Sequence, residues 1–181
     1  TLNITPLTNP INGTVTLLPN GTFSYIPTTN FVGNDAFTYQ ICDNGTPQAC
    51  DVATVHLTVL PTYAIAGTLF NDPNGLSNSL VDGTGIGTAS GTQMYANLVL
   101  GGIVIKTVTL AAGGTYSFTG LSAGSYTVVI ATSATATSPS VASGWTNVGE
   151  NFGTNNGAGT GNEGGTPNGS LAVTVGSSNV T

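Results

Sequence analysis

The strongest constraint on the fold of this chain is a five-residue pattern that occurs twice, at residues 21–25 and 114–118. Each copy reads Gly-Thr-aromatic-Ser-aromatic, so a turn residue precedes strict alternation of aromatic and hydroxyl side chains. A period of two is typical of a β-strand with one buried face, because successive side chains point to opposite faces. We therefore expect two β-domains in series, with the aromatic residues Phe23, Tyr25, Tyr116 and Phe118 pointing inward.

Composition also favours an all-β chain. The 181 residues include 26 Gly and 9 Pro, which interrupt helices, and a surplus of Thr and Val, which suit a pleated surface. A hydrophobic content of 39% is enough to form the cores of two small domains. From this composition we expect almost no helix. Since no apolar run approaches the ~18 residues of a membrane span, we also expect a soluble protein.

The charge balance excludes one class of partner. Seven acids stand against a single basic residue, Lys106, which gives a net charge of -6. Without a basic face the chain cannot neutralise phosphates, so nucleic acid is not an expected partner. A surface made soluble by hydroxyls and amides is similar to that of secreted structural proteins, although compositional drift would give the same result. Because the chain starts at Thr1 and not at Met, we expect a mature or excised segment.

A domain boundary is expected at Pro61, which separates a first domain (1–60) from a second (61–181). In the first domain, alternation predicts two hairpins, with strands at 13–18, 22–26, 35–41 and 52–59. In the second, it predicts strands at 63–70, 94–100, 102–110, 115–119, 125–130 and 170–175. A long Gly- and Asn-rich loop spans 146–169, and loops of that length are usually functional or mobile.

The two cysteines lie at the ends of the loop 43–49. Cys42 ends one predicted strand and Cys50 begins the next, so the pair would face each other across an antiparallel hairpin. We expect a structural disulfide, which fits an oxidising, extracellular setting. Two buried thiols or a two-thiolate metal site are the alternatives, and the metal site lacks the usual four ligands.

Longer motifs resemble two known families. Residues 12–27 (NGTVTLLPNGTFSYIP) and 30–39 (NFVGNDAFTY) resemble the cadherin-like, immunoglobulin-like tandem repeats of giant bacterial surface proteins, over about residues 1–60. Residues 65–75 (IAGTLFNDPNG) and 114–128 (GTYSFTGLSAGSYTV) are similar to the B-type repeats of bacterial collagen adhesins. Together these resemblances imply two immunoglobulin-like β-sandwich domains in an extracellular adhesin stalk or surface filament, which would bind surface glycans or cell-surface proteins of a host.

Both ends of the chain depart from these family patterns. Members of the first family usually begin with two further strands, and members of the second add one more strand, so we expect incomplete sheets at both chain ends. A neighbouring copy can supply a missing strand, which would join copies head to tail. The candidate apolar residues of such a strand are Leu2 and Ile4 at one end and Val173, Val175 and Val180 at the other.

The second resemblance also bears on cross-links and cations. Many B-type repeats carry a Lys–Asn isopeptide bond, but their first-strand Lys is missing here and Lys106 lies elsewhere, so we expect none. The resembling repeats often bind calcium in the loop where this chain has Asp72, Asn74 and Asp82. Gly83 stands where an EF-hand-like loop needs its bidentate carboxylate, and Asx turns explain the same residues without an ion.

A second, weaker acidic cluster contains Glu150 and Glu163.

The remaining residues give little support for catalysis. His56 alternates with apolar neighbours as an exposed strand residue would, and no sequence signal places a nucleophile beside it, so we do not expect an enzyme.

The alternative function is a carbohydrate-binding module of a secreted enzyme. It would need a planar array of exposed aromatic residues, for which only Trp145, Tyr63 and Tyr95 are available. We expect Trp145 to cap the second core instead.

Overall fold

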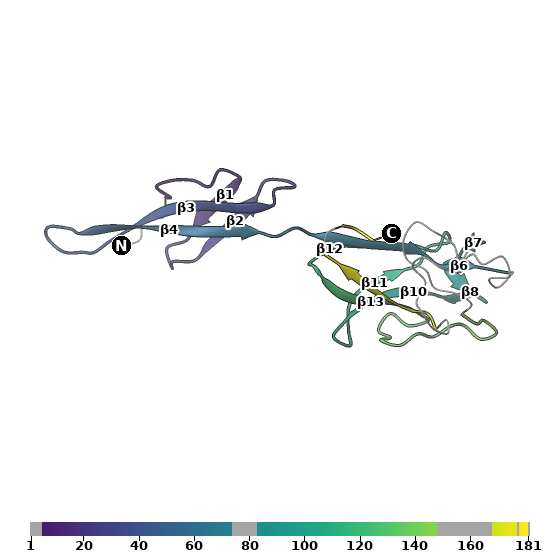
Figure 1. Cartoon of the computed structure of the whole chain (residues 1–181). Helices are drawn as coiled ribbons and strands as arrows, with labels where there is room; N and C mark the ends of the chain where they lie inside the picture. The colour runs from purple at the N-terminus through teal and green to yellow at the C-terminus, as the bar shows by residue number, and fades with distance from the viewer. Residues whose placement is uncertain (1–4, 74–82, 148–167, 177, 181) are drawn as a thin grey trace. The chain divides into compact units, whose positions relative to one another are not determined.

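The computed structural model describes residues 5–73, 83–147, 168–176 and 178–180 (Figure 1). The chain divides into two units, Thr1–Pro61 and Thr62–Thr181, one residue beyond the expected boundary. The described residues form strands and turns without a helix, so the chain is all-β as predicted. No helix in these ranges is long and apolar enough to cross a membrane.

The first domain consists of two antiparallel hairpins. β1 (Gly13–Leu17) pairs with β2 (Phe23–Pro27), and β3 (Gly33–Cys42) pairs with β4 (Cys50–Val59) without a register shift. A turn follows β1 because Gly21 adopts a φ of 86°, which residues with a side chain rarely do. These strands agree with the expected ranges, since alternation over five or more residues is a strong signal.

The core of the first domain is small. Val15, Leu17 and Phe37 are buried, and partly buried Tyr39, Val55 and Leu57 pack against them. The sequence predicts that Phe23 points inward, and this is confirmed, but the side chain is not fully covered. Phe23 points inward and its ring lies 5.3 Å from that of Phe37, but 43% of Phe23 stays exposed. Each layer contains one hairpin, so no described strand lies beyond β2 to cover it.

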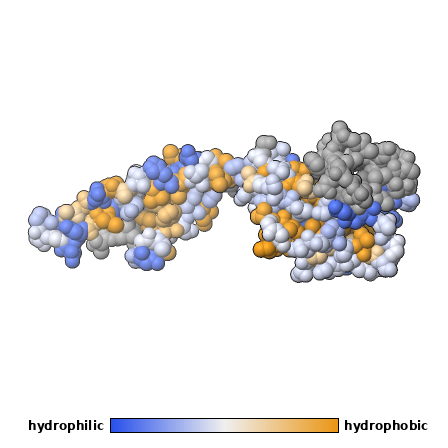
Figure 2. Space-filling view, turned by 60° about the horizontal axis from the view of Figure 1, so that its bottom comes forward, coloured by the Kyte–Doolittle hydropathy of each residue, from blue (hydrophilic) through white to orange (hydrophobic). Residues whose placement is uncertain are grey.

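Large apolar side chains consequently remain at the surface of the first domain, where Figure 2 shows them as orange areas. The exposed residues are Leu7, Ile11, Leu18, Phe23, Ile26, Val32, Ile41, Val52 and Leu60. Such surface on a small domain is typical of a site that another polypeptide covers.

The second domain is a β-sandwich. Its strands are β5 (Tyr63–Thr68), β6 (Phe70–Asn71), β7 (Thr84–Gly85), β8 (Thr88–Ala89), β9 (Thr92–Gln93), β10 (Tyr95–Leu100), β11 (Ile103–Thr109), β12 (Thr115–Leu121), β13 (Gly124–Ala131) and β14 (Ser170–Val175). One sheet has the order β11-β10-β13-β14, and β12 pairs with β5 in the other. All six predicted strands are present. The pairs β6–β7 and β8–β9 were not predicted because two residues per strand carry no periodicity.

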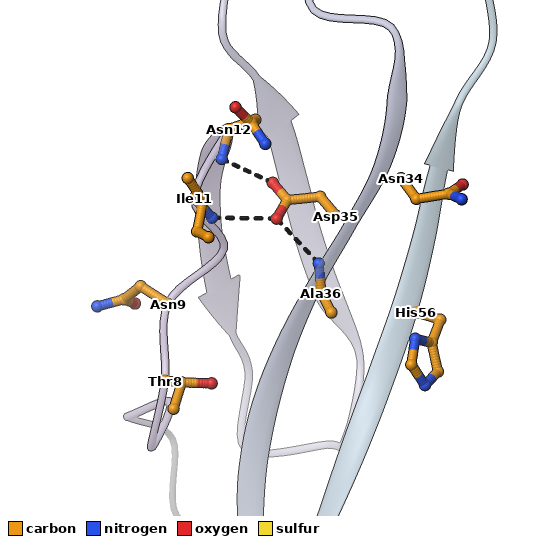
Figure 3. Close-up of a pocket in the computed structure, with 8 residues that line it drawn as sticks. All are labelled: Thr8, Asn9, Ile11, Asn12, Asn34, Asp35, Ala36 and His56. Atoms are coloured by element: carbon orange, nitrogen blue, oxygen red, sulfur yellow. Dashed lines mark hydrogen bonds between the residues drawn. The ribbon is translucent and has the colours of Figure 1, made fainter.

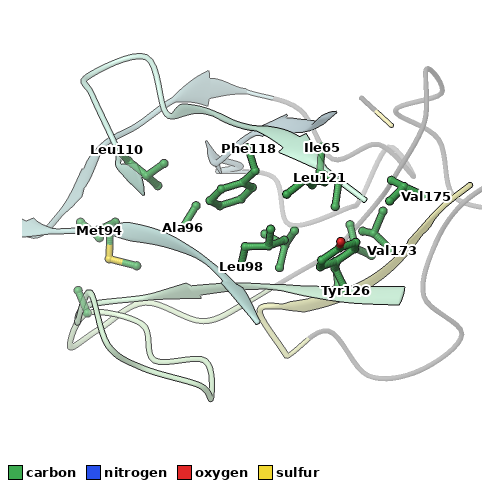
Figure 4. Close-up of a cluster of buried hydrophobic side chains, with 14 residues drawn as sticks. Ile65, Met94, Ala96, Leu98, Leu110, Phe118, Leu121, Tyr126, Val173 and Val175 are labelled. Atoms are coloured by element: carbon green, nitrogen blue, oxygen red, sulfur yellow. The ribbon is translucent and has the colours of Figure 1, made fainter. Parts of the chain in front are cut away.

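The main core lies between these two sheets (Figure 4). Phe118 and Ile65 from one sheet face Leu98 and Val173 from the other, and all four side chains are buried. Tyr116 packs against this core, as the repeated pattern predicts. Its ring lies on β5 at Gly67, where an added Cβ would come too close to the Tyr116 hydroxyl.

A second, smaller core lies on the other face of the four-stranded sheet. It contains Val99, Val129 and Ala131, with Ala136 of the loop after β13 packed against it. Asn97 of β10, which is fully buried, holds this loop in place. Its Nδ2 donates to the carbonyl oxygens of Ser133 and Ala136, at 2.9 Å each. Its Oδ1 accepts a 2.9 Å hydrogen bond from the hydroxyl of Thr107.

Trp145 is half-buried against the main core, as expected from the sequence. Its Nε1 donates to Oγ of Ser90, at 2.9 Å. Ser90 and Gly91 both have positive φ and form the two-residue turn between β8 and β9, a geometry that suits a tight hairpin. The indole therefore connects the segment after β13 to this hairpin.

Candidate functional site

The far end of the β3–β4 hairpin is closed by the predicted disulfide. Cys42 and Cys50 are bonded, with their Cα atoms 4.0 Å apart in the register Cys42↔Cys50. Asp43 orders the connecting loop by accepting hydrogen bonds from the backbone N–H groups of Ala49 and Gly45. These bonds hold the pKa of Asp43 below its ordinary value. The hairpin thus has a fixed register at its tip.

Asp35 joins three segments of the first domain, where sequence reasoning assigned it no role. Its Oδ1 accepts hydrogen bonds from the N–H groups of Ile11 (3.0 Å) and Ala36 (2.9 Å). Its Oδ2 accepts from the N–H of Asn12 (2.8 Å) and the hydroxyl of Tyr25 (2.9 Å). Four donors satisfy the carboxylate. Its role is therefore to hold the segment directly before β1 against β3.

The ionisation of Asp35 follows from these contacts. Burial alone would raise the pKa of Asp35, but the hydrogen bonds from Asn12, Ala36, Tyr25 and Ile11 outweigh it and hold the pKa below its ordinary value. The pKa of Tyr25 is raised by burial, by its hydrogen bond to Asp35 and by the charge of that residue. At neutral pH the pair is therefore a carboxylate that accepts and a phenol that donates.

An open depression of about 590 Å³ lies beside Asp35 (Figure 3). Its lining residues are Thr8, Asn9, Ile11, Asn12, Asn34, Asp35, Ala36 and His56. His56 is exposed on β4, as predicted. Because the carboxylate of Asp35 is already saturated, the depression presents amide, hydroxyl and imidazole groups to solvent and no available carboxylate.

Among the described residues of the first domain, the outer edge of β4 is the longest strand edge without a backbone ladder. Thr38 of β3 exchanges backbone hydrogen bonds with the N-terminal segment, through Leu7 N–H (2.9 Å) and Thr8 O (3.3 Å). Thr38 therefore faces away from β4, and Thr54, opposite it, faces away from β3. By alternation the backbone groups of Val52, His56 and Thr58 also point outward. No described residue forms a backbone ladder with them.

The predicted calcium loop is described only in part. Asp72 lies half-buried directly after β6, and Gly83 follows the undescribed stretch. Gly83 has a φ of 102°, and an added Cβ would lie 2.2 Å from the carbonyl oxygen of Asn71. The backbone therefore explains why this position carries no carboxylate.

Four predicted cation ligands lie outside the described residues: Asn74, Asp82, Glu150 and Glu163. Within the described ranges, no three His, Cys, Asp or Glu side chains gather to form a metal site. The calcium site remains a prediction.

The predicted assembly residues at the C-terminal end are used within their own domain. Val173 and Val175 are buried in the main core, because β14 pairs with β13. Val180 lies alongside β5, where its N–H and C=O bond to Ala64 O (3.0 Å) and Ala66 N–H (2.9 Å). These valines are therefore not free to complete the sheet of a neighbour, contrary to our expectation. Leu2 and Ile4 lie outside the described residues.

The candidate sugar-binding aromatics do not form an exposed array. Trp145 and Tyr63 are half-buried against the core, and the Tyr63 hydroxyl donates to the carbonyl of Gly176, at 2.8 Å. Tyr95 is half-buried on β10. Lys106 donates to the carbonyl of Thr119 on β12, so it connects the two sheets. The arrangement of these residues fits structural roles.

Comparison with known proteins found a similarity for the first domain. The family model of the bacterial Ig domain matches residues 1–58. No curated protein matches the chain. The likeness of the second domain to B-type adhesin repeats stays a prediction. Residues 1–58, which include the two hairpins of the first domain, are therefore similar to a bacterial Ig domain.

Proposed function

We propose that this chain is a structural segment of an extracellular bacterial surface protein, in which it acts as a repeat of an adhesin stalk or surface filament. The observation that carries the proposal is the similarity of residues 1–58 to a bacterial Ig domain, followed by a second β-sandwich. Only Leu60, Pro61 and Thr62 lie between β4 and β5. Serial β-domains with short connections are more typical of structural repeats than of a catalytic unit.

Two further observations support this assignment. The Cys42–Cys50 disulfide fits an oxidising compartment outside the cytoplasm. The most buried polar side chains, Asp35 and Asn97, have their hydrogen-bonding groups engaged in holding loops and strands. Polar groups that are saturated inside a domain contribute to its rigidity and not to the binding of a substrate.

For the mode of assembly, the C-terminal strand β14 bears on the choice between two routes. Burial of Val173 and Val175 favours covalent tandem repetition over donation of the C-terminal strand. In the remaining strand-exchange route, the segment with Leu2 and Ile4 completes the sheet of the next copy. Calcium at Asp72 would stiffen the connection between domains and take no part in chemistry.

Antibodies against the chain test the proposed location. They should label intact cells of the producing bacterium, and protease treatment of those cells should remove the label. Deleting the coding segment should shorten surface fibres seen by electron microscopy or weaken attachment. Labelling that appears only after permeabilisation would refute the proposal.

A further inference from the structure

The loop that joins β3 and β4 presents a reactive pair of residues at the surface (Figure 1). Asn44 is followed by Gly45, and both residues are exposed. An asparagine before a glycine is prone to deamidation, because glycine has no Cβ to keep its own backbone nitrogen away from the asparagine side chain. Within the described part of the chain, no hydrogen bond holds the Asn44 side chain. Asn44 therefore has the neighbour, the exposure and the freedom that this reaction requires.

The reaction needs no reagent except water. The backbone nitrogen of Gly45 attacks Cγ of Asn44, so a C–N bond forms and the Cγ–Nδ2 bond breaks. The proton of the Gly45 N–H leaves with the side-chain nitrogen as ammonia, and the product is a succinimide. Water then opens this ring at either carbonyl, which gives aspartate or isoaspartate. Since the attacking nitrogen must lose its proton, a group that holds the Gly45 N–H slows the reaction.

The side chain of Asp43 holds this N–H. Its Oδ1 accepts hydrogen bonds from the N–H groups of Gly45 (3.0 Å) and Ala49 (2.9 Å). The pKa of Asp43 lies below its ordinary value, so the carboxylate is charged at neutral pH. A negative charge beside an N–H disfavours loss of its proton, and the hydrogen bond favours the protonated nitrogen. Asp43 therefore acts on the attacking atom of the reaction.

The loop keeps Asp43 in this position. The N–H of Asp43 donates to the carbonyl oxygen of Ala49 at 2.9 Å, and its carbonyl oxygen accepts a hydrogen bond from Nε2 of Gln48 at 2.9 Å. The bond between Cys42 and Cys50 closes the loop directly before Asp43 and directly after Ala49. The contact between Asp43 and Gly45 thus depends on a closed loop.

We propose that Asn44 is a latent deamidation site, which the Asp43 carboxylate keeps unreactive while the loop is closed. The modification would place a second negative charge beside Asp43, and isoaspartate would also lengthen the backbone of the loop by a methylene group. This site goes beyond the proposed structural function and does not depend on it, because the chemistry needs only the loop and water.

The turn between β1 and β2 contains another Asn-Gly pair, which serves as an internal reference. Oδ1 of Asn20 accepts hydrogen bonds from the N–H (3.1 Å) and the hydroxyl (2.8 Å) of Thr22. The N–H of Gly21 donates to the carbonyl oxygen of Leu18 at 3.0 Å. No carboxylate takes part in these contacts, so a change at Asp43 should leave the deamidation rate of Asn20 unaltered.

Peptide mapping by mass spectrometry of the full chain, incubated at neutral pH, measures both rates. Asp43→Ala removes the acceptor of the Gly45 N–H. Because this hydrogen bond is exposed, we expect the typical net effect of a hydrogen bond, an increase of the Asn44 rate on the order of fivefold. The matched control is Asp51→Ala, which removes an acid that accepts from the N–H of Val52 (2.8 Å) instead of Gly45. This control should deamidate at Asn44 like the unmodified chain.

Reduction of the disulfide in the unmodified chain provides a second route, since it frees both ends of the loop. It should raise the rate at Asn44 and leave the rate at Asn20 unchanged. An unchanged Asn44 rate in Asp43→Ala or in the reduced chain overturns the proposal. Equal acceleration at Asn20 also overturns it, because the cause would then be unfolding of the whole domain. So does an Asn44 rate in the oxidised, unmodified chain as high as in a linear peptide of residues 43–49.

Discussion

Replacing Asn97 with Ala should destabilise the second domain by about 2 kcal/mol. The side chain is fully buried and makes three hydrogen bonds, two to loop carbonyls and one from Thr107. Each such bond contributes about 0.5–1.5 kcal/mol net, and a carbonyl left unpaired costs more if it stays dry. Three bonds together would contribute about 1.5–4.5 kcal/mol. Ser133 is exposed, so the loop can move towards water, which keeps the expected loss in the lower part of this summed range.

Trp145 offers a selective assay for this change. It is the single Trp of the chain and packs against the core of the second domain, so its fluorescence reports the unfolding of that domain in urea. The matched control is Thr174→Ala, which removes one exposed hydrogen bond to Ser125 and should shift stability by no more than about 0.5 kcal/mol.

A double-mutant cycle then tests the mechanism. Thr107→Val removes a hydroxyl that lies within hydrogen-bond distance of both Asn97 Oδ1 (2.9 Å) and the Ala134 carbonyl oxygen (2.8 Å), so its effect should add only in part to that of Asn97→Ala. Additive losses, or a loss for Asn97→Ala no larger than that of the control, would show that the loop is held by other contacts and refute the reasoning.

Three further outcomes follow from single residues. Burial raises the pKa of Tyr116 to about 12 from an ordinary 10.0, so the unfolded chain ionises first and the free energy of unfolding falls as pH rises between these values. Tyr116→Phe should remove this fall in urea titrations at pH 9 to 11.5. An unchanged pH dependence in Tyr116→Phe would contradict the prediction. The pKa of Asp35 is lowered, so its ionised form stabilises the first domain above the ordinary carboxyl pKa, and this stabilisation is lost as pH falls through the pKa of the folded state. Asp35→Asn should therefore make amide-exchange protection in β3 less dependent on acid pH. Equal pH dependence of this protection in both proteins would argue against the assigned role. Calcium added to chelator-treated protein should raise the melting temperature, because calcium at 100 times its Kd adds about 2.7 kcal/mol to the free energy of unfolding. Asp72→Ala should abolish this increase, while the control Asp51→Ala retains it. No shift in melting temperature at millimolar calcium would leave Asp72 as a turn residue.

The strands were largely predictable because alternation extends over five to ten residues in each. The same rule could have identified Asp35, which shares the inward face of its strand with Phe37 and Tyr39. An acid on a buried face needs donors, and that signal was available. Its donors at Ile11 and Asn12 lie over 20 positions away, so the sequence did not name them.

Asn97 gave a weaker signal. It stands in the apolar run of β10 between Ala96 and Leu98, both buried, so a period of two did not assign it to either face. Its acceptors, Ser133 and Ala136, belong to a loop with no periodic pattern. The exposure of Phe23 was missed for a related reason, since alternation shows which way a side chain points but not whether another strand covers it.

The disulfide at the tip of the β3–β4 hairpin has a mechanical consequence for a chain under tension. Force applied along the backbone passes from Cys42 to Cys50 through the sulfur atoms, so residues 43–49 carry no load. At ~3.5 Å per extended residue, about 25 Å of contour length stays hidden when the first domain is pulled apart. Reduction releases this length. A surface protein built from such domains would therefore extend further per unfolded domain in reducing surroundings than in oxidising ones.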